Sequence, residues 1–110
     1  MDSAVKVFEP TGILDGTKSH EFRQQIDKIV QEGAKIILID FKDVTFMDSS
    51  GLGALVLSLK TVRSAEARLF ICCLNDRIKI LFELTSMDKV FEIFSSREEF
   101  EETLVKKIVN

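Results

Sequence analysis

The residues whose types could take part in catalysis or binding form a short run, Asp48-Ser49-Ser50-Gly51-Leu52-Gly53. Asp and Ser are good helix N-caps, so the run could simply begin a helix. Capping does not explain the two glycines, because a glycine inside a helix lowers its stability by about 1 kcal/mol relative to alanine. The run therefore predicts positions where a side chain would be in the way, either of close packing within the protein or of close approach by a partner.

This run resembles three enzyme motifs, but for each motif the sequence lacks at least one essential residue. A phosphate-binding P-loop needs a Lys that is missing here, and a dinucleotide-binding fingerprint would have Gly or Ala where Val56 stands. A nucleophile elbow centred on Ser49 would need Gly in place of Met47. The single histidine, His20, precedes these serines and is expected on the surface near the start of a helix. We therefore expect no catalytic residue and no enzyme activity.

The two cysteines, Cys72 and Cys73, are adjacent in the sequence. Adjacent cysteines cannot close a loop in the ordinary way, and no group of His, Cys or carboxylate residues has the spacing of a metal motif. We expect the pair to occupy opposite faces of a buried strand as small core residues. The predictions are therefore no metal, no cofactor and reduced thiols, which are typical of the cytoplasm.

Length and composition limit the class of protein. The chain has 110 residues, of which 45% are hydrophobic and 30% charged, which suits one packed domain expected to span residues 1–110. The net charge is −3 and no Lys/Arg cluster occurs, so direct nucleic-acid binding is not expected. The longest apolar stretch, 51–59, is about half the length of a membrane span, and no secretory signal is visible.

Apolar periodicity predicts alternating strands and helices. Strands are expected at 4–8, 35–41, 67–73 and 90–94, and helices at about 17–32, from 49 or 50 to 63, from 75 and from 96. The segments 11–14 and 43–47 are expected to lead into the helices that follow them. This order predicts a layered α/β domain with a mixed, mostly parallel sheet of four to five strands and about four helices.

The helix that begins near Ser49 has two contrasting sides. One side is apolar and is expected to face the sheet; it consists of Leu52, Leu55, Val56, Leu59 and Val62. The opposite side carries no charge of its own, and it consists of Ser50, Ala54, Leu57, Ser58 and Thr61. An uncharged outer side indicates either burial beneath another helix or a docking face for a partner.

The segment from Asp43 to Gly53 resembles the signature of STAS domains of the bacterial anti-sigma factor antagonist type. The run from Thr11 to Asp15 is similar to the Gly-x-Leu-Asp element of this family. The third helix has a spacing similar to that of the family, at Ile78, Leu81, Phe82, Leu84 and Thr85. The resemblance covers nearly the whole chain. It departs from the family at the start, where members carry an additional strand before the one expected at 4–8.

The resemblance implies a partner switch. In this family the unphosphorylated antagonist binds a GHKL-type serine kinase that doubles as an anti-sigma factor, and the sigma factor is released. The kinase then phosphorylates the serine that matches Ser49, and a metal-dependent serine phosphatase removes the phosphate. Asp15 and Asp48 match acidic positions of the family beside this serine. The expected partner-binding residues are Asp15, Asp48, Ser50, Gly51, Gly53, Ala54, Leu57 and Ser58.

Two other functions stay open at this point. The first is a constitutive STAS scaffold whose Ser49 is never modified, because a hydroxyl that a kinase targets looks like one that caps a helix. The second is a nucleotide-binding STAS module, which the missing Lys and the incomplete glycine pattern disfavour. The sequence leaves the oligomeric state open.

Overall fold

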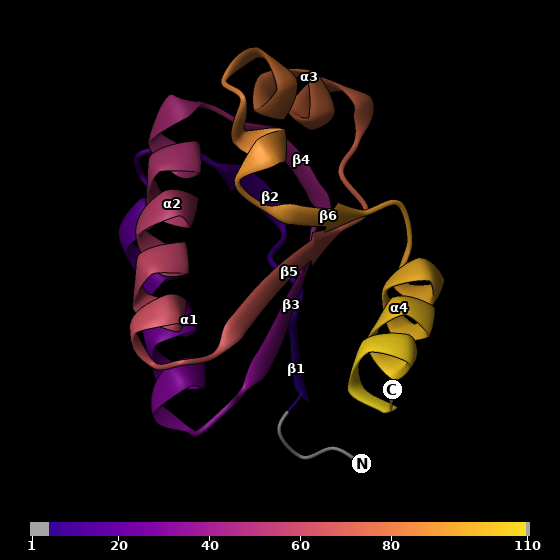
Figure 1. Ribbon diagram of the computed structural model, residues 1–110. Helices are drawn as coiled ribbons and strands as arrows, with labels where there is room; N and C mark the ends of the chain where they lie inside the picture. Colours follow the sequence, from indigo (N-terminus) through magenta and orange to yellow (C-terminus); the bar gives the residue numbers. More distant parts are fainter. Residues whose placement is uncertain (1–4, 110) are drawn as a thin grey trace.

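The computed structural model describes residues 5–109 and contains four α-helices and six strands. In chain order the elements are β1 (Val5–Phe8), β2 (Gly12–Leu14), α1 (Ser19–Gln31), β3 (Ile36–Asp40), β4 (Val44–Met47), α2 (Ser49–Ser64), β5 (Arg68–Cys72), α3 (Asp76–Leu84), the 3-10 helix η1 (Met87–Lys89), β6 (Glu92–Phe94) and α4 (Arg97–Val109) (Figure 1). This arrangement confirms the predicted α/β class and the four helices.

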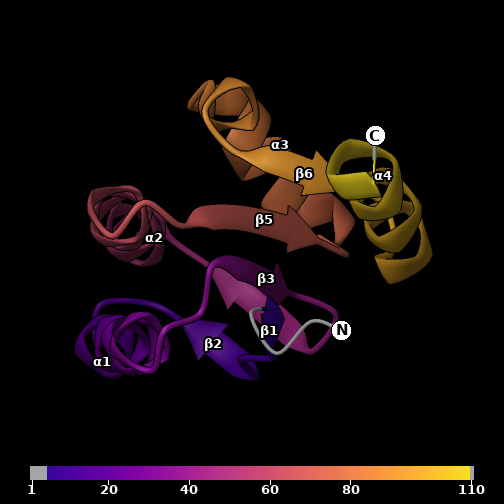
Figure 2. The same ribbon diagram turned by 60° about the horizontal axis from the view of Figure 1, so that its bottom comes forward.

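The main sheet has the strand order β1-β3-β5-β6, and all of its pairings are parallel. Helices α1 and α2 cover one face of this sheet, and α4 covers the other (Figures 1 and 2). The continuous apolar run of β3 fits this position, because Ile37 and Ile39 contact one core while Leu38 contacts the other. The sheet therefore has a helix layer on each side.

Two short segments that were expected only to connect elements are strands. β2 and β4 pair with each other in a parallel two-stranded sheet, with Leu14 opposite Met47. Each has no more than four residues, so a pattern of alternating burial is hard to recognise in the sequence. Leu14, Val44 and Met47 point into the core, whereas Ile13 and Phe46 are exposed. This small sheet leads directly into the start of α2.

Two other details differ from the sequence-based expectations. β6 begins at Glu92 rather than at Val90, because the backbone N–H groups of Val90 and Phe91 donate to the Met87 carbonyl and close the turn of η1. The expected lack of a strand before β1 concerns residues 1–4, which lie outside the described residues. Among the described strands β1 is at an edge of the main sheet.

The two cysteines do not lie on opposite faces of a strand. Cys72 ends β5, but Cys73 follows it with a φ of +70°, in the left-handed region. This turn of the backbone places the Cys73 sulfur 2.8 Å from the Cys72 sulfur. The expectation failed because the strand ends between the two residues.

Two cores hold the layers together. The larger one packs α1 and α2 on the sheet, and it is centred on fully buried residues such as Ile26, Ile37 and Leu55. The smaller one lies beneath α4, where the Phe70 and Phe100 ring centroids are 5.4 Å apart. Within residues 5–109, no helix combines the length and apolar character needed to cross a bilayer.

Candidate functional site

Asp48 directly follows β4, and Ser49 begins α2. Asp48 is the N-cap, and its carboxylate accepts a hydrogen bond from the Gly51 N–H at 3.0 Å. The Asp48 N–H itself donates to the Leu14 carbonyl at the end of β2, at 3.4 Å. The N-cap is therefore held from both sides, by the helix that follows and by the neighbouring strand.

Ser49 is the first residue of α2, and its side chain is exposed. In the part of the chain that the structure describes, its hydroxyl has no hydrogen-bond partner. Asp48 already performs the capping role that the sequence allowed for either residue. The Ser49 hydroxyl is thus accessible at a helix N-terminus, where backbone N–H groups and the helix dipole favour a negative charge.

Asp15 lies in the turn between β2 and α1, and its carboxylate organises that turn. Its Oδ1 accepts hydrogen bonds from the Thr17 hydroxyl at 2.6 Å and from the Thr17 N–H at 2.9 Å. The Thr17 hydroxyl, and then the local backbone, hold the pKa of Asp15 below its usual range, so this carboxylate is ionised at neutral pH. The same turn approaches α2, because the Ser19 hydroxyl is 3.3 Å from the Ser50 carbonyl oxygen.

The two glycines of the run have different surroundings. A Cβ at Gly51 would lie 2.1 Å from the Leu14 carbonyl oxygen, so this position requires glycine for close packing against β2. A Cβ at Gly53 would have nothing within 4 Å. The fold therefore explains Gly51 but gives no packing reason for Gly53. The other reason that the sequence offered for a glycine, close approach by a partner, stays a prediction for Gly53 alone.

The outer side of α2 is only partly exposed, which corrects one expectation. Ala54 is 4% exposed and Ser58 is 1% exposed, because α1 packs against this part of α2. These two residues are therefore covered by the protein itself and are removed from the expected docking face. Leu57 is 43% exposed, and Ser50 and Gly53 are also exposed. The apolar side behaves as predicted, with Leu52, Leu55, Leu59 and Val62 buried and Val56 half-buried.

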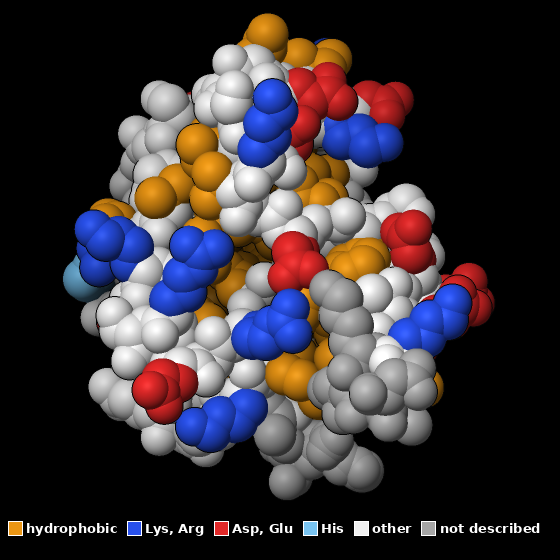
Figure 3. All heavy atoms as spheres, viewed as in Figure 1, with side chains coloured by type: hydrophobic (Ala, Val, Ile, Leu, Met, Phe, Trp, Pro, Cys, Tyr) orange, Lys and Arg blue, Asp and Glu red, His pale blue; other side chains and the backbone are white. Residues whose placement is uncertain are grey.

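A shallow concavity follows the boundary between the N-terminal halves of α1 and α2. We call it the α1–α2 surface, and its lining is formed by Gly16, Ser19, His20, Arg23, Ser50, Gly53, Ala54 and Leu57. His20 is exposed on α1, as the sequence predicted, and is the only pale blue side chain in Figure 3. The surface thus combines a bare glycine, an apolar side chain and basic groups close to the start of α2.

The sequence interpretation missed the exposed hydrophobic side chains of the small sheet. Ile13 and Phe46 are register partners on β2 and β4 and are 50% and 46% exposed. They immediately precede the buried pair Leu14 and Met47, so they lie within two residues of Asp15 and Asp48. Leu84, at the end of α3, is also exposed, and hydrophobic side chains are visible at the top of Figure 3, where Figure 1 places α3. Neighbouring side chains of a strand point to opposite faces, so recognition of the two strands would have placed Ile13 and Phe46 on the face opposite Leu14 and Met47.

The sequence matches the STAS domain family over residues 2–100, and the chain belongs to this family. An anti-sigma-B factor antagonist of Listeria monocytogenes is 39% identical over 82 residues, which cover 74% of this chain and 72% of the relative. An anti-sigma-B factor antagonist of Staphylococcus aureus is 31% identical over 87 residues, 79% of this chain and 81% of the relative.

Solved structures show the same fold. A crystallised Thermotoga maritima protein has a TM-score of 0.84 with 23% identity, covering 94% of this chain and 89% of the other. The anti-sigma factor antagonist SpoIIAA in its unphosphorylated form has a TM-score of 0.68 with 21% identity, covering 96% and 94%. Its phosphorylated form has a TM-score of 0.67 with 20% identity, covering 94% and 95%.

Proposed function

We propose that this protein is an anti-sigma factor antagonist that works as a binding module without catalysis of its own. Unphosphorylated, it binds a GHKL-type serine kinase that acts as an anti-sigma factor, and the sigma factor is released. Phosphorylation of Ser49 ends this binding, and a metal-dependent serine phosphatase restores it. The observation that carries the proposal is the exposed Ser49 hydroxyl, which begins α2 beside a cap that Asp48 already provides. The names of the curated relatives support the same role.

The position of Ser49 suits a modification that changes the surface and not the fold. A phosphoryl group adds a charge of about −2, and a helix N-terminus accommodates such an anion. Asp48 and Asp15 lie close to the same helix start and are acidic, so the phosphate makes this region strongly negative. A partner that docks on the neutral hydroxyl would then bury like charges against each other, which costs several kcal/mol.

The partner surface in this proposal extends from Ser49 over the α1–α2 surface. Ser50, Gly53 and Leu57 form its exposed part on α2, and the half-buried Asp15 and Asp48 lie at its edge. Gly51 contributes indirectly, because its lack of a side chain lets α2 begin against β2. Exposed apolar anchors such as Leu57 surrounded by small residues suit a reversible interface.

Incubation with the cognate kinase and ATP is expected to add one phosphate, located on Ser49. The reason is that Ser49 combines exposure, an unbonded hydroxyl and a position at the helix start. Intact-mass and fragment-ion spectra locate the phosphate, and Ser49→Ala is the control that should remain unmodified. A phosphate on Ser50 or Thr45 would contradict the assignment, and no phosphate at all would favour the constitutive scaffold.

Leu57→Glu is expected to abolish kinase binding while lowering the free energy of unfolding by less than about 1 kcal/mol, as is usual for exposed positions. Leu57 is 43% exposed, so a charged side chain there keeps its hydration. Ser58→Glu is the matched control: Ser58 is 1% exposed, and a buried charge should cost several kcal/mol. Thermal unfolding and titration calorimetry with the kinase measure both effects. A large loss of stability in Leu57→Glu would reject the docking face.

A further inference from the structure

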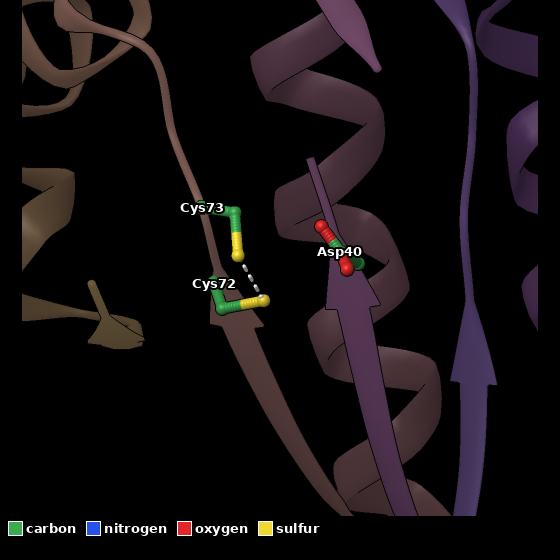
Figure 4. A group of neighbouring side chains, drawn as sticks. All are labelled: Asp40, Cys72 and Cys73. Carbon is green, nitrogen blue, oxygen red and sulfur yellow. Dashed lines mark hydrogen bonds between the residues drawn. The ribbon is translucent and has the colours of Figure 1, made fainter. Parts of the chain in front are cut away.

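A second group of reactive side chains lies on the opposite side of the main sheet from α2. β3 and β5 are neighbouring parallel strands, and their register places Asp40 opposite Cys72. Asp40 follows Leu38 by two residues, and Leu38 and Cys72 both belong to the core beneath α4. Figure 4 shows the Asp40 carboxylate at the end of β3 beside the sulfurs of Cys72 and Cys73.

The three residues present a compact set of donor atoms. One carboxylate oxygen of Asp40 and the sulfurs of Cys72 and Cys73 all lie within 4.8 Å of one another. Zinc binds sulfur at about 2.3 Å and carboxylate oxygen at about 2.0–2.2 Å. Two ligand atoms of one zinc ion are therefore at most twice these bond lengths apart, which is close to the separation of the three donor atoms here. The Cys73 side chain is only half-buried, which provides both a route for an ion and room for its sulfur to rotate away from that of Cys72.

The Asp40 carboxylate is buried and incompletely paired. Its side chain is 0% exposed; Oδ1 accepts a hydrogen bond from the Lys42 N–H at 2.9 Å, but Oδ2 has no hydrogen-bond partner. The Lys42 ammonium and the Arg97 guanidinium are each 3.6 Å from Oδ2. Both cations instead contact Glu9 Oε2 at 2.8 Å. Oδ2 therefore accepts no hydrogen bond in the space that it shares with the two sulfurs, so it is available as a ligand atom.

The surrounding charges fit a soft divalent cation held by these donors. Two thiolates and one carboxylate around such an ion leave one net negative charge. Lys42 and Arg97 lie beside that charge and stabilise it. A soft cation is favoured over magnesium or calcium, because two of the three donors are sulfur.

We infer that Asp40, Cys72 and Cys73 form a binding site for a thiophilic divalent cation such as Zn²⁺. Binding releases the two thiol protons to solvent and forms two metal–sulfur bonds and one metal–oxygen bond, with no change of oxidation state. The site lies under α4, on the other side of the sheet from α2, and is independent of the proposed phosphorylation of Ser49 (Figure 2).

Cobalt(II) is the probe for this inference. Titration of the 110-residue protein, kept reduced by a phosphine, should produce a sulfur-to-cobalt charge-transfer band in the near ultraviolet and saturate at one ion per chain. Zn²⁺ should displace the cobalt and raise the melting temperature of the reduced protein. A missing band, or a pair of thiols that only oxidises to a disulfide, would overturn the inference.

Three variants make the test specific. Asp40→Asn retains the oxygen that accepts from the Lys42 N–H, and Cys73→Ser changes a half-buried residue, so both should fold. Each should weaken cobalt binding at least 10-fold, since even the loss of an outer partner of a metal ligand costs about 10- to 100-fold. Asp43→Asn is the control, because Asp43 is exposed and lies outside the donor set. Unchanged affinity in Asp40→Asn or Cys73→Ser would reject the assigned ligands.

Discussion

Ser49→Asp is expected to weaken binding to the serine kinase at least 100-fold while leaving the fold intact. A like-charge contact of about 3 kcal/mol is sufficient for this loss, because each 1.4 kcal/mol changes affinity tenfold. The melting temperature should stay close to that of the unmodified protein, since Ser49 is exposed and an acidic residue suits the first turn of a helix. Titration calorimetry with the kinase and thermal unfolding measure the two quantities.

Two further variants separate charge from shape. Ser49→Asn has the size of Asp without its charge and should retain most of the binding. Ser49→Ala should bind the kinase but should never be released by phosphorylation, because it has no hydroxyl. Equal losses in Ser49→Asn and Ser49→Asp would show that the partner rejects bulk and not charge. Unfolding of Ser49→Asp would show that Ser49 is structural, and the switch would lose its support.

Gly51→Ala and Gly53→Ala are expected to have opposite effects on stability, although they add the same methyl group. At Gly51 the new Cβ would lie 2.1 Å from the Leu14 carbonyl oxygen, so β2 and α2 must separate. Overpacking of this kind costs about 1–3 kcal/mol, and we expect the upper end because the obstacle is backbone. At Gly53 the methyl group meets nothing within 4 Å, and replacement of a helical glycine should stabilise the protein by about 1 kcal/mol.

The glycine pair also tests the proposed partner surface. Gly53→Ala should bind the kinase more weakly in spite of its higher stability, because in the proposed interface the partner lies against the backbone that the methyl group covers. Chemical unfolding gives the two free energies of unfolding, and calorimetry gives the affinity. Full affinity in Gly53→Ala would remove this part of α2 from the interface. A Gly51→Ala protein as stable as the unmodified one would contradict the packing that the structure shows.

Local sequence patterns determined most of the secondary structure. Helical stripes such as Phe22, Ile26 and Ile29 predicted α1, and the unbroken apolar run 36–39 predicted β3, because side-chain direction repeats within a few residues in both elements. The start of α2 was also predictable, since Asp48 and Ser49 are neighbours in the chain and capping is a local interaction. The resemblance to STAS domains rested on this same segment, and the family is confirmed.

Contacts between distant segments decided what the sequence left open. Gly51 and Gly53 look alike in the sequence, and only the position of β2 shows that Gly51 is required for packing. Ala54 and Ser58 were assigned to an outer face, but the packing of α1 buries them. Asp40 and Cys72 are separated by more than thirty residues, and the register of β3 and β5 places them side by side. Local patterns determine the direction in which a side chain leaves its own helix or strand. The residues that this side chain contacts depend on how helices and strands from distant parts of the chain pack against one another.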